Sequence, residues 1–518
     1  MVTQSAAWRS DPQSCNGRKL GERAGWPLFI VAVLILVIAG ARDIAAPWEN
    51  GMRGGAAASY TDGAVAHTLR YGIGVTLGLP TFVVEVDGGL DKRVNWHHPP
   101  LYWLLASGAA WLFGHHTWVL RAFQLLLFLP GLFGLFWLLR LRSGALPAGL
   151  ACVLFASCPL VAYYGPMALQ DGAVLAWGLL TIASFQALLE RPGLRPWLRT
   201  AALFFFVTSL DYPGYWWGLA MFVLAATTAP RWRSVATAIS FFPVSLLSFT
   251  ATAVHYGLVL GGPWAYIREV FHVVGADHDD ARATVTWDRI ENAIRDVLIT
   301  HGNWPVLALA VIGIVLATLS RRPEVRRCAS AALALTIPGV INYGAMFVHA
   351  VGHVFWSMHG FGGVCVFAAV APIVGIQSWA EGAGRGRVLG AVLLAASLAV
   401  VAWGAHRTHL LVGSNAFVDN GTPATMAKAI PHMDSCAWSM TSAPRCPQQF
   451  FGHTQTWGGI DTAEKLRIAL ELGGKAALRG KFAFVVDPRH RDAGLLALLD
   501  SLGSRVDADE VLVYHIKL

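Results

Sequence analysis

Long apolar stretches recur along most of this chain, and they constrain its fold more than any other feature. A helix needs about 20 apolar residues to cross the hydrocarbon core of a bilayer. Windows of this kind predict about eleven membrane spans, at residues 26–40, 118–139, 146–164, 172–189, 200–210, 214–229, 235–254, 304–319, 329–347, 361–376 and 388–403. The chain is therefore predicted to be a polytopic α-helical membrane protein.

The composition also favours a bilayer over water as the solvent. Of the 518 residues, 55% are hydrophobic and 14% are charged, and the mean hydropathy is +0.51. Charged residues supply about a quarter of an ordinary soluble protein. The net charge of +8 does not indicate nucleic-acid binding, because the Lys and Arg residues stand in short clusters between apolar runs and form no basic stripe.

The basic clusters predict the orientation of the chain, because Lys and Arg are enriched in cytoplasmic loops. With a cytoplasmic N-terminus, the inner connections carry Arg140 and Arg142; Arg191, Arg195 and Arg199; Arg231 and Arg233; Arg321, Arg322, Arg326 and Arg327; and Arg385 and Arg387. This arrangement requires residues 99–114, which are short for a span, to form an interfacial or re-entrant helix on the outer side. We expect a multi-pass protein of the cytoplasmic (inner) membrane, with a retained signal-anchor as its first span and its C-terminus outside.

The polarity of the chain changes near its C-terminal end, which predicts a separate domain. The expected parts are a cytoplasmic segment at 1–25, a transmembrane domain at 26–410 with an outer juxtamembrane loop at 42–117, and a small soluble α/β domain at 411–518. Within the last part the pattern predicts helices at 463–478 and 492–502 and strands at 482–486 and 511–516. Cys436 and Cys446 lie in this polar tail, where an oxidising compartment would allow them to pair.

Ionisable side chains of the transmembrane domain gather in the loops predicted to face outward. A charge at membrane depth is costly, so such positions are candidates for function. These candidates are Glu49, Asp62, His97, His98, Asp171, Asp211, His349, His353 and His359.

Several short motifs follow one another in the same outer loops. They are Trp48-Glu49-Asn50-Gly51, Leu69-Arg70-Tyr71-Gly72, His97-His98-Pro99-Pro100, the Tyr-, Gly- and Met-containing run 163–171 that ends at Asp171, Asp211-Tyr212-Pro213-Gly214, and His353-Val354-Phe355-Trp356. In order and sidedness they resemble the GT-C fold membrane glycosyltransferases, in the branch of the protein O-mannosyltransferases and the lipid A aminoarabinose transferase. The resemblance implies a glycosyltransferase that moves a hexosyl or pentosyl group from a polyprenyl-phosphate donor to a glycan, lipid or protein acceptor at the outer face.

The resemblance also implies roles for single residues. An inverting transfer needs a base for the acceptor and a counter-charge for the departing phosphate. Glu49 and Asp62 are alternative candidates for the base, and Asp171 is expected to support the acceptor site or a metal. The expected phosphate-binding residues are His98, His97 and Arg70, and the secondary candidates are Asp211 and His353.

A divalent cation is the one cofactor that this chemistry suggests. Mg²⁺ or Mn²⁺ prefers hard oxygen ligands, which carboxylates such as Asp171 and Glu49 and the phosphate of the donor would supply.

Some of these residues also have structural interpretations, and the function has alternatives. Asp171 is suited to cap the span that follows it, and Asp211 to cap the helix that begins near Pro213. Arg70 is suited to snorkel to the interface. The alternative functions are a membrane transporter or lipid flippase and an assembly subunit. Transporters place their ionisable sites near the midplane, whereas the polar groups here collect at one interface.

Overall fold

The fold is described from a computed structural model of the chain. It describes residues 12–42, 44–45, 61–86, 89–94, 98–228, 230–268, 270, 286–345, 354–381, 384–413, 438–441, 455–457, 462–467, 481–486, 492–508 and 511–517.

Helices make up most of the described chain. The first group is α1 (Pro12–Ala41), α3 (Gly63–Tyr71), α4 (Ile73–Thr76), α5 (Leu101–Phe113), α6 (Thr117–Ser143), α7 (Ala145–Ser157), α8 (Pro159–Tyr164), α9 (Gln170–Glu190) and α10 (Leu194–Leu210). The second group is η2 (Tyr212–Tyr215), α11 (Trp216–Ala226), α12 (Arg231–Ile239), α13 (Phe242–Leu260), α15 (Trp287–Arg295), η3 (Asp296–Thr300), α16 (Trp304–Leu319), α17 (Pro323–Ala345), η4 (Val354–Ser357), α19 (Met358–Glu381), α20 (Arg385–Gly413) and α23 (Ala493–Leu502).

The described helices confirm a multi-pass membrane protein. Seven of them are long and apolar enough to cross a bilayer, namely those in α1, α6, α9, α12 with α13, α17, η4 with α19, and α20. The number rises to eight if α15 and η3 count with α16 as one span, although the pair bends by 92°. The other predicted spans correspond to the shorter helices α7, α10 and α11, of 13, 17 and 11 residues.

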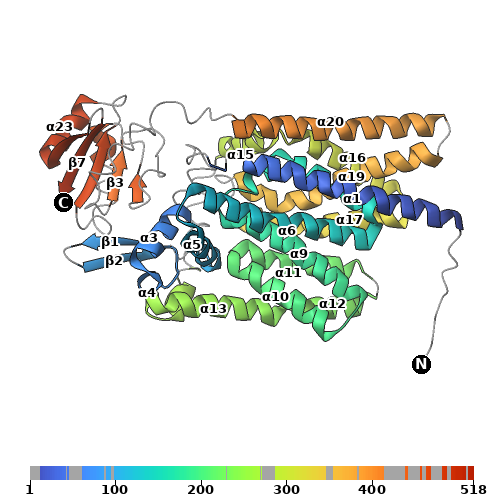
Figure 1. Cartoon of the computed structure of the whole chain (residues 1–518), viewed down its shortest axis with the longest axis horizontal. Helices are drawn as coiled ribbons and strands as arrows, with labels where there is room; N and C mark the ends of the chain where they lie inside the picture. Colours follow the sequence, from blue (N-terminus) through green and yellow to red (C-terminus); the bar gives the residue numbers. More distant parts are fainter. Residues whose placement is uncertain are drawn as a thin grey trace.

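The spanning helices lie side by side along the long axis of the molecule (Figure 1). Small residues allow this close packing, as the contact of α6 with α9 shows. A Cβ atom added at Gly131 would lie 2.7 Å from the Ala176 Cα, and one added at Gly134 would lie 2.5 Å from the Leu180 nitrogen. Because these distances are too short for any side chain, only glycine permits the two backbones to approach in this way.

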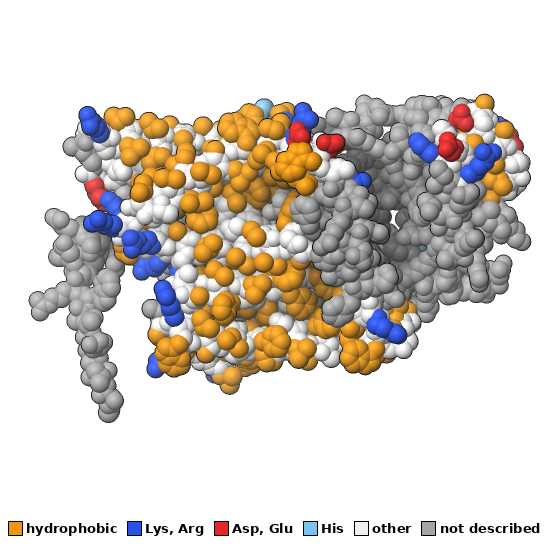
Figure 2. Space-filling model, turned by 180° about the vertical axis from the view of Figure 1, so that it is seen from behind, with side chains coloured by type: hydrophobic (Ala, Val, Ile, Leu, Met, Phe, Trp, Pro, Cys, Tyr) orange, Lys and Arg blue, Asp and Glu red, His pale blue; other side chains and the backbone are white. Residues whose placement is uncertain are grey.

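Lys and Arg side chains gather at the end of the bundle that lies away from the C-terminal domain, as Figure 2 shows. Arg231, Arg321 and Arg385 are exposed and come from three of the connections predicted to be cytoplasmic. This separation of basic residues is the pattern that the positive-inside rule describes.

Arg142, which the sequence assigned to a cytoplasmic connection, is buried at the end of a helix. The residue lies in the last turn of α6 and is 6% exposed. Its guanidinium donates to Gln186 Oε1 on α9 at 2.8 Å, to Thr228 Oγ1 after α11 at 3.2 Å and to Ser330 Oγ on α17 at 2.6 Å. The helix ends converge around this side chain, which therefore ties them together and is shielded from solvent.

The opposite end of the bundle, which faces the C-terminal domain, is the domain end. Figure 1 shows α3, α4, α5 and a hairpin of β1 (Thr81–Val86) and β2 (Gly89–Val94) at this end. With only 13 residues, α5 is too short to span a bilayer, in keeping with the interfacial or re-entrant helix expected at 99–114. The antiparallel hairpin, in which Thr81 pairs with Val94, was not predicted.

The described part of the C-terminal domain contains a five-stranded sheet with the order β4-β3-β5-β7-β6. Its strands are β3 (Trp438–Thr441), β4 (Gln455–Trp457), β5 (Lys481–Val486), β6 (Gly503–Ala508) and β7 (Val511–Lys517). β3 is parallel to β4 and β5, and β7 is antiparallel to β5 and β6. Leu495 and Leu499 of α23 pack against Phe484 and Tyr514 of the sheet.

The α/β character predicted for the tail is confirmed. The helix predicted at 492–502 and the strands predicted at 482–486 and 511–516 correspond to α23, β5 and β7, whereas β3, β4 and β6 were not predicted. Of the helix predicted at 463–478, residues 463–467 are described and helical. Cys436 and Cys446 lie outside the described residues, so their pairing stays a prediction.

Candidate active site

An ion pair between His98 and Asp211 lies at the domain end of the bundle. His98 precedes the two prolines that lead into α5, and Asp211 follows the last residue of α10. The His98 Nδ1 lies 2.8 Å from Asp211 Oδ1, and the two side chains are 23% and 3% exposed. The amide nitrogen of Gln170, which begins α9, lies 3.3 Å from the same His98 nitrogen. Three elements far apart in the sequence therefore converge on one imidazole.

Backbone contacts hold both members of this pair in place. Asp211 Oδ1 also accepts a hydrogen bond from the backbone N–H of Tyr212 at 2.7 Å, so the carboxylate caps η2. This capping role was one of the two interpretations of Asp211, and the structure combines it with the ion pair. The Tyr256 hydroxyl of α13 donates to the His98 carbonyl oxygen, which fixes the loop in front of α5.

The surroundings of His98 favour its protonated form. Burial by itself lowers the pKa of the imidazole, but the nearby Asp211 carboxylate outweighs burial and the pKa is raised above its ordinary value of 6.5. The carboxylate of Asp171 contributes in the same direction. Since Nδ1 faces Asp211, Nε2 is the nitrogen left for a ligand, and it has no hydrogen-bond partner among the described residues.

Asp62 forms a second carboxylate–imidazole pair at the domain end. Its Oδ1 lies 2.8 Å from Nε2 of His115, which stands in the turn between α5 and α6. This hydrogen bond raises the pKa of His115. The neighbouring Thr61 donates its hydroxyl to the Ala168 carbonyl oxygen at 2.6 Å. The start of α3 is thereby attached to the segment that leads directly into Asp171.

Asp171 occupies the first turn of α9 and is 2% exposed. The residue at the N-cap position is Leu169, and no side chain caps the helix, so the interpretation of Asp171 as an N-cap is wrong. The Asp171 Oδ1 lies 3.6 Å from Nε2 of His359, at the start of α19. Asp62, His98 and Asp171 thus lie at one end of the bundle, on segments that contact one another.

Other predicted site residues are placed differently or are not described. The Arg70 guanidinium lies 5.3 Å from the ring centroid of Tyr71, within α3. Glu49, His97 and His353 lie outside the described residues, as does His349.

The described residues do not by themselves form a metal site. Among them, no group of three or more His, Cys, Asp and Glu side chains is placed to hold an ion. Asp171 offers one buried carboxylate oxygen without a hydrogen-bond partner in the described chain, and His359 Nε2 lies 3.6 Å from that oxygen. A divalent cation therefore remains a proposal that needs ligands from elsewhere.

Sequence reasoning missed two residues of the candidate site. His115 was not considered, although it lies in a short His-His turn beside the α5 segment that was predicted to be interfacial. Gln170 was also missed, because an uncharged amide is not among the ionisable residues by which candidate sites were identified. Their roles depend on contacts between distant segments, and their only sequence signal is adjacency to the predicted motifs.

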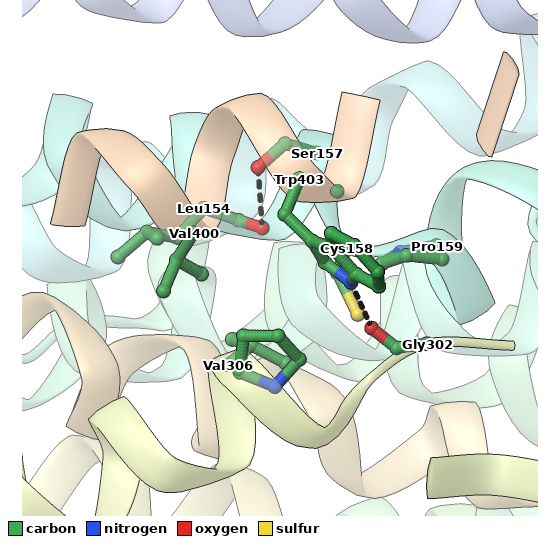
Figure 3. A pocket seen from close by; sticks show the side chains of 10 residues that line it. Leu154, Ser157, Cys158, Pro159, Gly302, Val306, Val400 and Trp403 are labelled. Atoms are coloured by element: carbon green, nitrogen blue, oxygen red, sulfur yellow. Dashed lines mark hydrogen bonds between the residues drawn. The ribbon is translucent and has the colours of Figure 1, made fainter. Parts of the chain in front are cut away.

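A small cavity between α7, α16 and α20 is separate from this site (Figure 3). Leu154, Cys158, Val306 and Val400 line it, and Trp403 donates its indole N–H to the Gly302 carbonyl oxygen at 2.9 Å. The lining is mainly apolar and contains none of the paired carboxylates. The cavity therefore offers no counter-charge for a phosphate.

The fold and the site together define a class, the polytopic membrane proteins with the GT-C glycosyltransferase fold. Residues 97–257, which contain His98, Asp171 and Asp211, match the family described as dolichyl-phosphate-mannose-protein mannosyltransferase. No curated protein sequence matches the chain significantly.

Three solved structures share the fold over most of this chain. ArnT from Cupriavidus metallidurans, bound to undecaprenyl phosphate, is 13% identical with a TM-score of 0.58, over 95% of this chain and 98% of its own. The Archaeoglobus fulgidus oligosaccharyltransferase, in complex with Zn and sulfate, is 11% identical with a TM-score of 0.55, over 92% of this chain and 71% of its own. The mycobacterial arabinofuranosyltransferase AftD is 14% identical with a TM-score of 0.53, over 96% of this chain and 40% of its own.

Proposed function

We propose that this protein is a glycosyltransferase that moves a sugar from a polyprenyl-phosphate donor to an acceptor at the outer face of the cytoplasmic membrane. The observation that carries the proposal is the convergence of Asp62, His98 with Asp211, and Asp171 at one end of a GT-C bundle. A related fold is found in ArnT with undecaprenyl phosphate bound, which supports a lipid-phosphate ligand.

His98 is the proposed contact for the phosphate of the donor. The ion pair with Asp211 favours the imidazolium, and Nε2 then donates a charge-assisted hydrogen bond to a phosphate oxygen. This contact strengthens as the bond from the sugar C1 to the phosphate oxygen breaks, because the leaving lipid phosphate gains negative charge. His98 thereby takes the place that the resemblance gives to Lys in some relatives.

A carboxylate is the proposed base on the acceptor side. It accepts the proton of the acceptor hydroxyl while that oxygen forms the new bond to C1 and the phosphate departs with the bonding electrons. Asp62 is partly exposed and is held by His115, so it is the described residue best suited to meet an acceptor. Glu49 remains the alternative that the resemblance implies. Asp171 is the proposed support for the bound substrates at the buried side.

The orientation follows from the separation of charge. The exposed basic residues lie at the end of the bundle opposite the site, and the positive-inside rule assigns that basic end to the cytoplasm. Donor, acceptor and the C-terminal domain are then all outside.

If Mg²⁺ or Mn²⁺ takes part, Asp171 is the described carboxylate that would hold the ion, and the ion would neutralise phosphate charge. Loss of turnover in EDTA, restored by either ion, tests this point.

Purified protein in lipid nanodiscs provides the test of the proposal. It is given radiolabelled polyprenyl-phosphate donors that carry mannose, arabinose or aminoarabinose, and consumption of each donor is measured. We expect one donor to be consumed, and we expect Asp171→Asn to lower turnover by about 10²-fold, because the bound substrates lose their alignment. Asp288→Asn, at an exposed carboxylate of α15, is the matched control and should retain full turnover. Full turnover in Asp171→Asn would contradict the proposed site, and consumption of none of the donors would contradict the proposed reaction.

A further inference from the structure

Within the described part of the chain, the buried His359 imidazole lacks the contacts that buried polar groups normally make. It stands in the first turn of α19 and is 0% exposed. Neither ring nitrogen has a hydrogen-bond partner among the described residues, and the same holds for Asp171 Oδ1. The His359 Nε2 and this oxygen lie 3.6 Å apart. Two polar groups of complementary chemistry, both unsatisfied by the described residues, therefore lie just beyond hydrogen-bond distance of each other.

Close backbone packing fixes His359 in this position. A Cβ atom added at Gly339 of α17 would lie 2.3 Å from the Gly360 nitrogen and 3.1 Å from the His359 carbonyl carbon. The first turn of α19 is thus held directly against α17. Because buried polar groups are rarely left unpaired in native proteins, an imidazole at such a fixed position without a described partner requires an explanation. In enzymes, hydrogen bonds of the active site are often long without substrate and shorten when it binds.

We propose that His359 is a positioning residue for Asp171 in the proposed glycosyl transfer. In the substrate complex its Nε2–H donates to Asp171 Oδ1 and fixes the orientation of the carboxylate toward the bound substrates. A carboxylate held by an imidazole keeps one direction, and catalysis depends steeply on such alignment. His359 itself touches neither donor nor acceptor, since no part of its side chain reaches the surface. This inference rests on the proposed function and adds a residue from α19 to the site.

Steady-state kinetics of the full chain in nanodiscs test the role of His359. With the donor that the wild type consumes, His359→Ala is expected to lower kcat by about 10²-fold, because the carboxylate loses its orientation. The KM for the donor should change by less than about threefold, since His98 is expected to bind the phosphate. His359→Gln, which keeps an N–H donor, should recover at least part of the lost kcat.

A second buried histidine provides the matched control. His301 is 6% exposed and is fully hydrogen-bonded, with Nε2 at 3.0 Å from the Tyr164 hydroxyl and Nδ1 at 2.8 Å from the Asp296 carbonyl oxygen. His301→Gln should lower the melting temperature without a comparable loss of kcat in the folded protein.

A double-mutant cycle completes the test. If His359 acts through Asp171, adding His359→Ala to Asp171→Asn should lower kcat no further. Equal kcat in the wild type and His359→Ala would overturn the inference while leaving the proposed function intact. A loss that multiplies with that of Asp171→Asn, or that His359→Gln fails to recover, would also overturn it. A wild type that consumes no donor would overturn the proposed function and this inference with it.

Discussion

Asp211→Asn is the substitution that most directly tests the electrostatic design of the site. The Asn side chain keeps an oxygen that can cap η2 through the Tyr212 N–H, so the turn after α10 should remain folded. The same oxygen can still accept the hydrogen bond from His98 Nδ1, but the negative charge is gone. The substitution therefore removes the charge and spares the geometry.

The expected size of the effect follows from the contact that is changed. A hydrogen bond that involves a charged group contributes about 1.5–3 kcal/mol, and a neutral one about 0.5–1.5 kcal/mol. The difference, about 1–1.5 kcal/mol, corresponds to about five- to twelvefold in an equilibrium constant. We therefore expect the donor KM of Asp211→Asn to rise by about five- to twelvefold at alkaline pH, where protonation of His98 limits binding of the phosphate.

The difference in donor KM between the wild type and Asp211→Asn should depend on pH, because it depends on the protonation of His98. Asp211 raises the pKa of His98 above 6.5, so the wild type keeps the imidazolium to a higher pH than the variant does. In the variant the burial of His98 is no longer offset by the Asp211 charge, so the KM values of the two proteins should converge only when the pH falls below the lower pKa that His98 has in the variant. As pH rises through the raised pKa, donor binding should weaken in the wild type as well.

The assay is the donor KM of the wild type, Asp211→Asn and the control Asp288→Asn, with the melting temperature recorded alongside. It runs from about pH 4.5 to about pH 8.5, which is about two units on either side of the ordinary His pKa. Identical KM profiles for the wild type and Asp211→Asn would refute the reasoning. So would a loss of the same size at every pH, since a charge effect on His98 must vanish once the imidazole is protonated.

Two further substitutions separate the acceptor side of the site from the stability of the bundle. Asp62→Asn keeps a hydrogen-bond acceptor for His115, and if Asp62 is the base it should lower kcat by about 10²- to 10⁴-fold. Single-turnover rates measure this loss, and unchanged rates would assign the role of base to Glu49. Arg142→Ala leaves buried oxygens on α9 and α17 without their donor and should destabilise the fold by about 1–3 kcal/mol. The expected readout is a lower melting temperature that Arg142→Lys restores only in part, and an unchanged melting temperature would show that these hydrogen bonds contribute little.

Much of the fold could be predicted because the relevant signals are local. The free energy of moving a residue into hydrocarbon depends on its own side chain, so the apolar windows locate the helices without any knowledge of their neighbours. The same holds for α23 and β5, whose patterns lie within single short segments. β1 and β2 escaped prediction because Glu85, Asp91 and Lys92 interrupt the apolar alternation of these strands. The burial of Arg142 could not be predicted because its partners come from three other segments.

The amino-acid sequence alone determined that this is a membrane protein with its polar groups collected at one interface, and it singled out His98, Asp171 and Asp211 by their motifs. Only the tertiary structure decided which of these groups are partners. His98 meets Asp211 across 113 residues, and Asp171 faces His359 across helices that are far apart in the chain. Hydropathy and capping act within one helix, whereas the distance between two ionisable groups depends on how whole helices pack. The close contact at Gly339 that holds α19 against α17 is a packing effect of this kind.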